Sequence, residues 1–354
     1  MLSRSEFDVM LALKKTPAAS QRAIASECGM SLGAVNAVVK SLGERGLVEG
    51  GALTAEGEDE LSPYKVRNAV IMAAGLSSRM APLSYECPKG VLKVRGEVLI
   101  ERQIRQLKEA GIDDITVVVG FKKEEFFYLE DLFGVRIVVN TDYATRNNHA
   151  TLFQVRDIVG NSYICSSDNY FSRNPFESCV DDAYYAALYA DGPTSEWCIY
   201  EGDDGYIDRV SIGGENAWYM MGHVFWSEPF SRKFVEILER EYDTPEIRDK
   251  LWEAVYAAHL DELKLRIRRY DARDIFEFDS LDELRGFDAS YIDDTRSQII
   301  RQLAARLGCG EAALTDFHAR KACGGTQAVG FTFRYQNETY QYDYKNKEME
   351  KING

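Results

Sequence analysis

The sequence predicts an α/β fold: a doubly wound, mostly parallel sheet preceded by a small winged helix-turn-helix domain. After Asn68, apolar strand-like runs such as "NAVIMAAG" and "ITVVVG" alternate with helical runs such as "LIERQIRQLKEAG" and "KEEFFYLEDLFG". This alternation is typical of a parallel sheet with helices on both faces. Before that point the pattern is helical. A chain of 354 residues can form two or three domains, and we expect them at residues 1–64, 65–290 and 291–354.

Residues 1–64 carry the helix-turn-helix pattern. The stretch "SQRAIASECGMSLGAVNAVVKSLGERGLVEG" predicts a helix, a turn at Gly29 and a second helix that ends near Gly46, and "GGALTAEGEDEL" follows as the expected wing hairpin. The stretch resembles the winged-helix domain of MarR-like regulators, which implies DNA contact through the helix from Ser31 to Ser41. The alternative is dimerisation or regulation, because residues 1–60 carry six Lys or Arg against nine Asp or Glu and so lack a basic surface.

The loop after the first strand, within "NAVIMAAGLSSRMAPLSYECPKG", is the most informative part of the chain. In a sheet of this kind, ligands bind beyond the carboxyl ends of the strands, where this loop lies. Gly75 leaves the backbone open to a phosphate or a base, and Arg79 and Lys89 supply positive charge for a triphosphate. The spacing A-A-G-x-x-S-R-x-x-P-L-x-x-x-x-P-K-G resembles the signature of the nucleotidyltransferase superfamily that activates sugar and polyol phosphates.

A carboxylate follows a second strand of the predicted sheet. Asp168 comes just past the apolar run of "SYICSSDNYF". A nucleotidyl transfer requires a divalent cation, and Mg²⁺ prefers carboxylate oxygens together with water and phosphate. We therefore expect Asp168 to be a magnesium ligand. The alternative is that it only begins a turn, since Asp-Asn is a favoured turn pair.

From Asn68 to about Asp288 the chain resembles the bacterial CTP:phosphocholine cytidylyltransferases of this superfamily. The matching stretches, in order, are "AAGLSSRMAPLSYECPKG", "LIERQIRQLKEAGIDDITVVVGF", "DYATRNNHATLF", "SSDNY", "SEWCIYEGDDG", "GHVFW", "LWEAV" and "IFEFDSLDEL". The resemblance implies a Rossmann-like fold and transfer of CMP from CTP to phosphocholine with Mg²⁺, giving CDP-choline and pyrophosphate. Two alternatives stay open: a nucleotidylyltransferase for a sugar phosphate or another amino-alcohol phosphate, and a DNA-binding regulator that uses the transferase fold as a ligand sensor.

The same resemblance assigns the site residues. It implies Ala73, Ala74, Gly75, Asn148 and Thr151 for the nucleotide; Arg79, Lys89 and Asp168 for catalysis; Trp197, Trp252 and Glu277 for the choline group; and Asp168 with Glu253 or Asp279 for the metal. A trimethylammonium group is recognised by aromatic faces and carboxylates, but core packing is the alternative for both tryptophans. Two positions depart from the family: Leu251 replaces an aromatic residue, and Glu253 stands where the family usually has Asp.

The third segment follows Asp288. "YIDDTRSQIIRQLAARLGCGEAALTDFHA" reads as helical, and "GFTFRYQNETYQYDY" alternates like a hairpin with a Gln-Asn turn. In part, "ARKACGGTQAVGFTFRYQNETYQYDY" resembles the K-x-G-G-T-N nucleotide-binding hairpin of choline-kinase-like phosphotransferases. No catalytic loop of that family follows in this sequence. We therefore expect a packing element here rather than a kinase.

Charge and composition exclude several classes of function. The net charge of −15 disfavours general nucleic-acid binding. No apolar run approaches the roughly 20 residues needed to cross a bilayer, and the N-terminal stretch fits neither a secretory nor a transit peptide. The seven scattered cysteines favour reduced thiols in the cytoplasm. A homodimer formed through the N-terminal domain is a further prediction.

Overall fold

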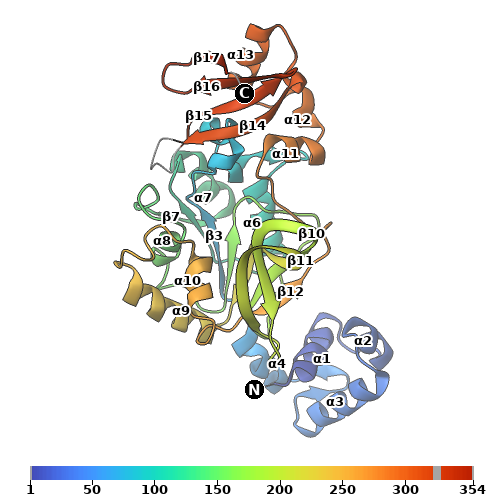
Figure 1. The fold of residues 1–354 in the computed structure, drawn as a ribbon. Coiled ribbons are helices and arrows are strands. Elements are labelled where there is room, and N and C mark those ends of the chain that lie inside the picture. The colour runs from blue at the N-terminus through green and yellow to red at the C-terminus, as the bar shows by residue number, and fades with distance from the viewer. Residues whose placement is uncertain (1, 322–327, 353–354) are drawn as a thin grey trace.

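The computed structural model describes residues 2–321 and 328–352. A small helical unit lies at one end, a large twisted sheet flanked by helices forms the middle, and another sheet, which is antiparallel, covers the other end (Figure 1). Among the helices of the described residues, none has the length and apolar character needed to cross a membrane.

The N-terminal unit is a winged helix. Its elements are α1 (Arg4–Lys15), α2 (Gln21–Glu27), α3 (Leu32–Glu44), β1 (Val48–Glu49), β2 (Ala52–Leu53) and α4 (Ala55–Leu61). Serine side chains cap α1, α2 and α3 at their N-termini, and Gly29 makes the predicted turn with a positive φ of 64°. Only the first part of "GGALTAEGEDEL" forms the wing hairpin, because Thr54 caps a new helix there.

The central sheet of the described residues has seven strands in the order β12-β10-β11-β8-β3-β6-β7. Their bounds are β3 (Asn68–Ala73), β6 (Ile115–Val119), β7 (Arg136–Val139), β8 (Ser162–Ser166), β10 (Tyr184–Glu201), β11 (Ile207–Trp226) and β12 (Arg266–Arg269). The run β8-β3-β6-β7 is parallel, and only β11 lies antiparallel to its neighbours. The predicted doubly wound, mostly parallel sheet is confirmed, while the long β10–β11 hairpin was not predicted.

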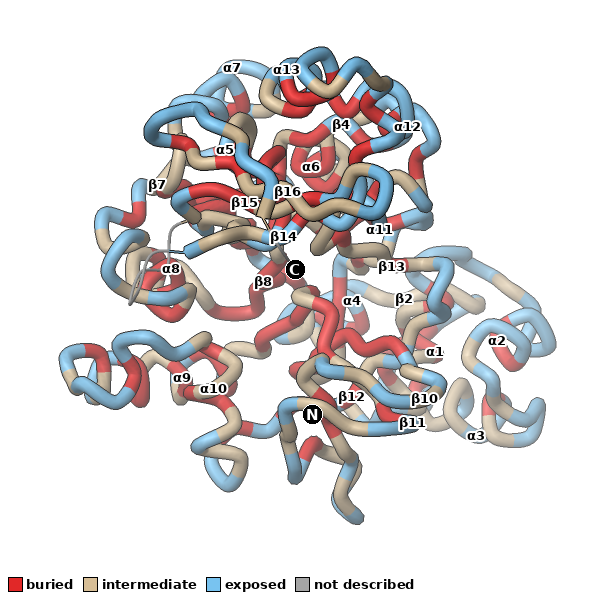
Figure 2. Tube along the Cα trace, turned by 45° about the horizontal axis from the view of Figure 1, so that its top comes forward, coloured by how far each residue is buried: buried red, intermediate tan, exposed pale blue. Residues whose placement is uncertain are grey.

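Helices cover both faces of this sheet because its central strands are apolar on both sides. The helices are α6 (Leu99–Glu109), α7 (Tyr128–Phe133), α8 (His149–Phe153), α9 (Glu228–Glu241) and α10 (Trp252–Ala258). On β3, Val70 packs into the cluster that contains α8, α9 and α10. Its neighbours Ala69 and Ile71 pack into the cluster that contains α6 and α7. Figure 2 shows this buried interior as a red stretch along the central strands.

The C-terminal unit combines helices with a sheet of four strands within the described residues. Its elements are α11 (Leu281–Phe287), α12 (Ser290–Asp293), α13 (Gln298–Leu307), β14 (Leu314–Lys321), β15 (Ala328–Tyr335), β16 (Glu338–Asp343) and β17 (Met349–Ile352). The predicted hairpin is β15–β16, with Gln336 at a positive φ in its turn. The helical prediction for "LTDFHA" is wrong, since this stretch is β14 and pairs with β15.

One apolar cluster joins the C-terminal unit to the transferase body. Phe331 and Phe333 of β15 share it with Met80 and Leu83, which follow β3. The boundary at residue 290 therefore crosses a continuous core, and the division into domains stays a prediction. The K-x-G-G-T resemblance falls mostly on residues 322–327, outside the described residues.

Candidate active site

The loop that follows β3, residues 73–90 and here called the signature loop, forms one wall of the site. It contains the short helices η2 (Ser78–Met80) and α5 (Leu83–Glu86) and enters η3 (Lys89–Val91). A Cβ atom at Gly75 would meet nothing within 4 Å, so the backbone there faces open space. A Cβ atom at Gly90 would lie 2.7 Å from Ser167 Oγ, so only glycine allows the loop to reach the end of β8.

A cleft of about 910 Å³ opens at the carboxyl ends of β3 and β8. It is the position where a doubly wound sheet binds ligands. Of the residues expected from sequence, the cleft is lined by Ala73, Ala74, Gly75, Arg79, Lys89, Asn148, Thr151, Asp168, Glu277 and Asp279. Residues from four separate stretches of the chain thus meet on one concave surface.

Three carboxylates of the described residues converge on the ammonium of Lys89; Asp168, Glu277 and Asp279 are here called the acidic cluster. Lys89 Nζ lies 2.8 Å from Asp168 Oδ2, and 3.4 Å from both Glu277 Oε1 and Asp279 Oδ1. Arg79 adds an ion pair, with its Nη1 atom 2.5 Å from Asp279 Oδ2. The Lys89 side chain is only 5% exposed, so these are interactions screened little by water.

Strand pairing explains why residues so distant in sequence meet here. The short strands β9 (Tyr170–Phe171) and β13 (Ile275–Phe276) pair antiparallel, with Phe276 opposite Tyr170. This register brings the residues that follow β13 beside the residues that precede β9. Ser280 then caps the N-terminus of α11, and Glu283 in the first turn of this helix accepts a hydrogen bond from the Asp279 backbone N–H at 2.7 Å.

The close packing of charges in the acidic cluster shifts the pKa values of Glu277 and Lys89. Burial, together with the charge of Asp168, raises the pKa of Glu277 to about 7. Burial alone would lower the pKa of Lys89, but the charges of the acidic cluster raise it above the ordinary lysine value. Lys89 therefore stays protonated at neutral pH.

The donor set of the cleft fits a divalent cation. The acidic cluster offers carboxylate oxygens, the ligands that Mg²⁺ prefers. Its three carboxyl groups surround a single buried ammonium, whose one positive charge does not neutralise all of them. Within the described part of the chain, no group of three or more His, Cys, Asp or Glu side chains is already arranged as a metal site. The point where the carboxylates converge holds Lys89 instead.

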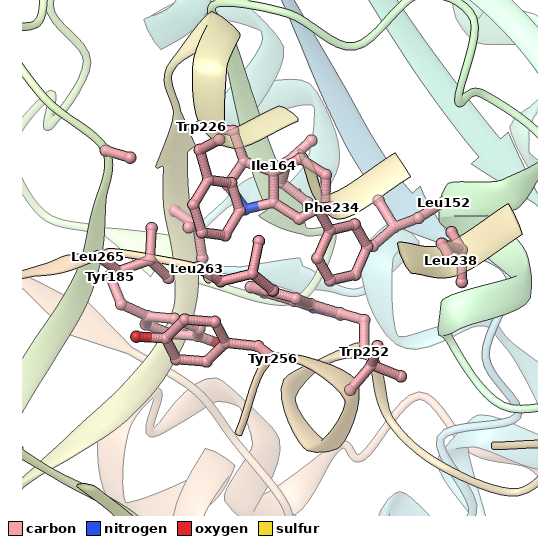
Figure 3. Close-up of a cluster of buried hydrophobic side chains, with 14 of the residues drawn as sticks. Leu152, Ile164, Tyr185, Trp226, Phe234, Leu238, Trp252, Tyr256, Leu263 and Leu265 are labelled. Carbon is pink, nitrogen blue, oxygen red and sulfur yellow. The ribbon is translucent and has the colours of Figure 1, made fainter. Parts of the chain in front are cut away.

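Three of the expected site residues are not brought to the cleft. Trp252 is fully buried, stacked on Tyr185 at a ring-centroid distance of 5.6 Å (Figure 3). Glu253 accepts hydrogen bonds from Tyr185 Oη at 3.1 Å and from Asn148 Nδ2 at 3.2 Å. Trp197 lies on β10 and packs, partly buried, against the same core cluster. Their roles in choline and metal binding stay predictions, and for Trp252 the packing matches the core alternative.

Other residues in the cleft were not anticipated. Asn140 follows β7 and donates a hydrogen bond from Nδ2 to Thr151 Oγ1 at 3.1 Å. The strand-end rule that singled out Asp168 also applies to Asn140 and could have found it. Arg146, Arg248 and Lys321 also line the cleft, but no local sequence pattern marks them.

Comparison with known proteins identifies the fold and the family. Residues 69–156 match the MobA-like NTP transferase domain, and residues 2–49 match a winged helix-turn-helix DNA-binding family. The choline-phosphate cytidylyltransferase of Streptococcus pneumoniae is 34% identical over 217 residues, which cover 61% of this chain and 95% of that protein. The chain belongs to the choline-phosphate cytidylyltransferase family.

One further relative and one solved structure extend the comparison. The 2-aminoethylphosphonate cytidylyltransferase of Lancefieldella rimae is 35% identical over 234 residues, covering 64% of this chain and 93% of that protein. The solved structure of the CTP:phosphocholine cytidylyltransferase of Streptococcus pneumoniae matches with a TM-score of 0.61 and 34% identity. The match covers 63% of this chain and 98% of that chain. This member of the choline-phosphate cytidylyltransferase family is therefore a nucleotidyltransferase enzyme that carries a winged helix before its catalytic fold.

Proposed function

We propose that the enzyme transfers CMP from CTP to phosphocholine with magnesium, giving CDP-choline and pyrophosphate. The observation that carries the proposal is the convergence of Arg79, Lys89 and the acidic cluster on one cleft. A chain of this family that keeps these groups together retains the charges that nucleotidyl transfer needs.

The cleft residues divide the work between the two ends of the nucleotide. The backbone at Gly75 lies against the phosphates, while Asn148 and Thr151 face the base. Lys89 and Arg79 bind the β- and γ-phosphates and stabilise the charge that builds on the leaving pyrophosphate. No general base is needed, because a phosphomonoester is already ionised near neutral pH.

Magnesium would be held by Asp168, with Asp279 or Glu253 as the second carboxylate. When bound, the ion supplies charge neutralisation at the α-phosphate. Asp279 is the better supported of the two, because it shares Lys89 with Asp168. Glu253 is engaged by Tyr185 and Asn148.

The amine end is recognised by Glu277. Its carboxylate lines the cleft and gives a cationic head group an opposite charge. For the aromatic face that a trimethylammonium requires we propose Trp197, which packs partly buried on β10 outside the lining of the cleft. The ring of Trp252 is buried against Tyr185, and its backbone N–H, which donates to Asn148 Oδ1 at 2.7 Å, would position a residue at the base end instead.

A second candidate acceptor is a primary amine such as 2-aminoethylphosphonate. The Lancefieldella rimae relative bears that name and is 35% identical, and Leu251 lines the cleft where the resemblance leads us to expect an aromatic residue. A primary ammonium donates hydrogen bonds to carboxylates and does not need an aromatic cage. A sugar phosphate has no cation to pair with Glu277 and is disfavoured.

Pyrophosphate release by the purified protein tests these proposals. CTP and UTP are each paired with phosphocholine, phosphoethanolamine, 2-aminoethylphosphonate and glucose 1-phosphate. We expect the highest kcat/KM with CTP and phosphocholine. The Trp197→Ala variant should lose about 1–2 kcal/mol of affinity for phosphocholine, and less for the primary amines, whose ammonium can also donate hydrogen bonds to Glu277. Silence with CTP and every amine would reject the function.

DNA binding through the N-terminal unit is a separate proposal, supported by the family match to residues 2–49. The exposed side chains of α3 include Asn36 and Lys40, but Lys40 lies 3.7 Å from Glu44, which offsets its charge. A gel-shift assay with the promoter DNA of its own gene, across a salt series, tests it. A sequence-specific shift would support a regulatory role, and binding equal to that of random DNA would reject it.

A further inference from the structure

The C-terminal unit reaches the active-site cleft. Its strand β14 ends at Lys321, and Lys321 lines the same cleft as Arg79 and Lys89. From its sequence, this unit was expected to be a packing element only. Because the C-terminal unit places the positive charge of Lys321 in the cleft, we expect it to take part in ligand binding as well as in packing.

Strand β14 packs its apolar side chains against the transferase body. Phe317 and Ala319 belong to the apolar cluster that joins the C-terminal unit to the signature loop. The pairing of β14 with β15 shifts register between Arg320 and Lys321, and beyond this shift Lys321 lines the cleft. Arg320 points to the other face and pairs with Asp343 at 3.4 Å.

The position of β14 is fixed against the signature loop itself. The strand contacts η2, the turn that contains Arg79. Beside it, the rings of Tyr85 and Tyr344 stack with centroids 3.7 Å apart. Glu86 accepts hydrogen bonds from the backbone N–H groups of Gln298 at 2.9 Å and Ile299 at 3.3 Å, at the start of α13. The signature loop and the C-terminal unit therefore form one packed structure.

The balance of charges in the cleft favours a role for Lys321 in phosphate binding. The acidic cluster already engages both cations of the signature loop, Lys89 and Arg79. A nucleoside triphosphate brings several more negative charges into the same cleft. Lys321 is exposed at its mouth, where a flexible ammonium can reach a phosphate without the cost of prior burial.

We propose that Lys321 binds phosphate oxygens of the nucleotide, so that the C-terminal unit completes the active site. The inference rests on the proposed function in one respect, that a nucleoside triphosphate occupies the cleft. It adds a residue from outside the transferase sheet to the phosphate-binding set.

Titration calorimetry on the full-length protein tests the proposal with CTP and Mg²⁺, and with cytidine as the ligand that lacks phosphates. Lys321→Ala should raise the Kd for CTP about tenfold, the size expected for one charged hydrogen bond. It should leave the Kd for cytidine and the Tm unchanged. Lys321→Arg should restore most of the affinity. Lys345→Ala, an exposed lysine after β16 that does not line the cleft, is the matched control.

Each outcome of these binding measurements supports or overturns the role of Lys321. An unchanged Kd for CTP in Lys321→Ala, or an equal loss in Lys345→Ala, overturns the proposal. If CTP binding depends on Lys321 while no acceptor is turned over, the proposed function fails and the role of Lys321 stands. If the wild-type protein does not bind CTP, both are wrong.

Discussion

Lys89 is buried among carboxylates and yet remains charged. Its ammonium lies 2.8 Å from Asp168 and 3.4 Å from Glu277 and Asp279. A buried cation without such partners would lose its proton or destabilise the fold. The pairing therefore keeps a phosphate-binding charge ready in the cleft and holds the carboxylates in place.

The Asp168→Asn variant tests this arrangement. The amide keeps the shape but removes the negative charge that pairs with Lys89, so kcat/KM should fall by at least about 100-fold. Pyrophosphate release measures the loss, and circular dichroism checks the fold. Asp191→Asn, at an exposed position of β10, should behave as wild type. Activity within tenfold of wild type in Asp168→Asn would contradict the assignment.

His223 predicts a pH dependence of stability. It lies fully buried on β11, and burial, together with the charge of Arg268, lowers its pKa to about 3. Between about pH 6.5 and pH 3 the unfolded chain binds a proton at this position and the folded chain does not, so the free energy of unfolding decreases as the pH falls. Urea titrations at pH 7, 6 and 5 measure it.

The His223→Asn variant isolates this contribution. It lacks the titrating ring, so its difference in unfolding free energy from wild type should change by up to about 1.4 kcal/mol per pH unit below 6.5. A difference that stays constant from pH 7 to pH 5 would show that His223 has the same pKa in the folded and unfolded chains, which would contradict the effect of burial.

At the scale of elements, Glu86 links α5 to α13. Its carboxylate bonds the Ser297 side chain and two backbone N–H groups at the start of that helix. These groups have no partner within the helix. A residue of the signature loop thus caps a helix more than 200 positions away in the chain.

Replacing Glu86 by Ala should lower the free energy of unfolding by about 1–2 kcal/mol, the cost of a lost helix cap. Thermal or urea unfolding measures it. Glu124→Ala, at an exposed position of the short helix η4 (Lys123–Phe126), removes the same side chain where it caps no helix in this way and should cost little. Equal losses in the two variants would argue against the cap.

Sequence pattern was sufficient for elements whose signal is local. The strand β3, the helix α6 and the carboxylate after β8 follow from apolar runs and strand ends. Elements stabilised by distant partners were missed. "LTDFHA" has no strong strand pattern and becomes β14 only by pairing with β15. Burial of Trp252 likewise depends on Tyr185 and Trp226, which no local pattern places beside it.

The candidate site divides in the same way. Arg79, Lys89 and Asp168 were predicted to line one cleft because their stretches end strands of the same sheet, and they do line it. Lys321 was not, because its place in the cleft results from the packing of the whole C-terminal unit. Sequence resemblance cannot assign a residue whose position depends on such packing.

For the whole molecule, the winged helix and the C-terminal unit lie at opposite ends of the central sheet (Figure 1). The cleft is lined by Lys321 of the C-terminal unit and by none of the described residues of the winged helix. The N-terminal unit meets the transferase body at Cys179 and through an ion pair between Arg4 and Asp181. The carbonyls of Pro63 and Tyr64 accept hydrogen bonds from Asn161 and Val180 of the body, while the Tyr64 ring packs against Phe7 of the N-terminal unit.

Deleting residues 1–61, which spares these two carbonyls, should leave kcat and KM essentially unchanged, because no element of the cleft is lost. Steady-state kinetics of the shortened protein measure this, with Tm as the control for folding. A folded product that has lost turnover would show that the winged helix takes part in catalysis.

Lys89 neutralises part of the negative charge of the acidic cluster from within the protein. Lys89 acts as an internal counter-ion, so the carboxylates need no outside ion to stay close together. Treatment with EDTA should therefore leave the melting temperature unaltered while it abolishes turnover, and added magnesium should restore the activity at once. A chelator that also lowered the melting temperature would mean that an external ion shares this structural duty.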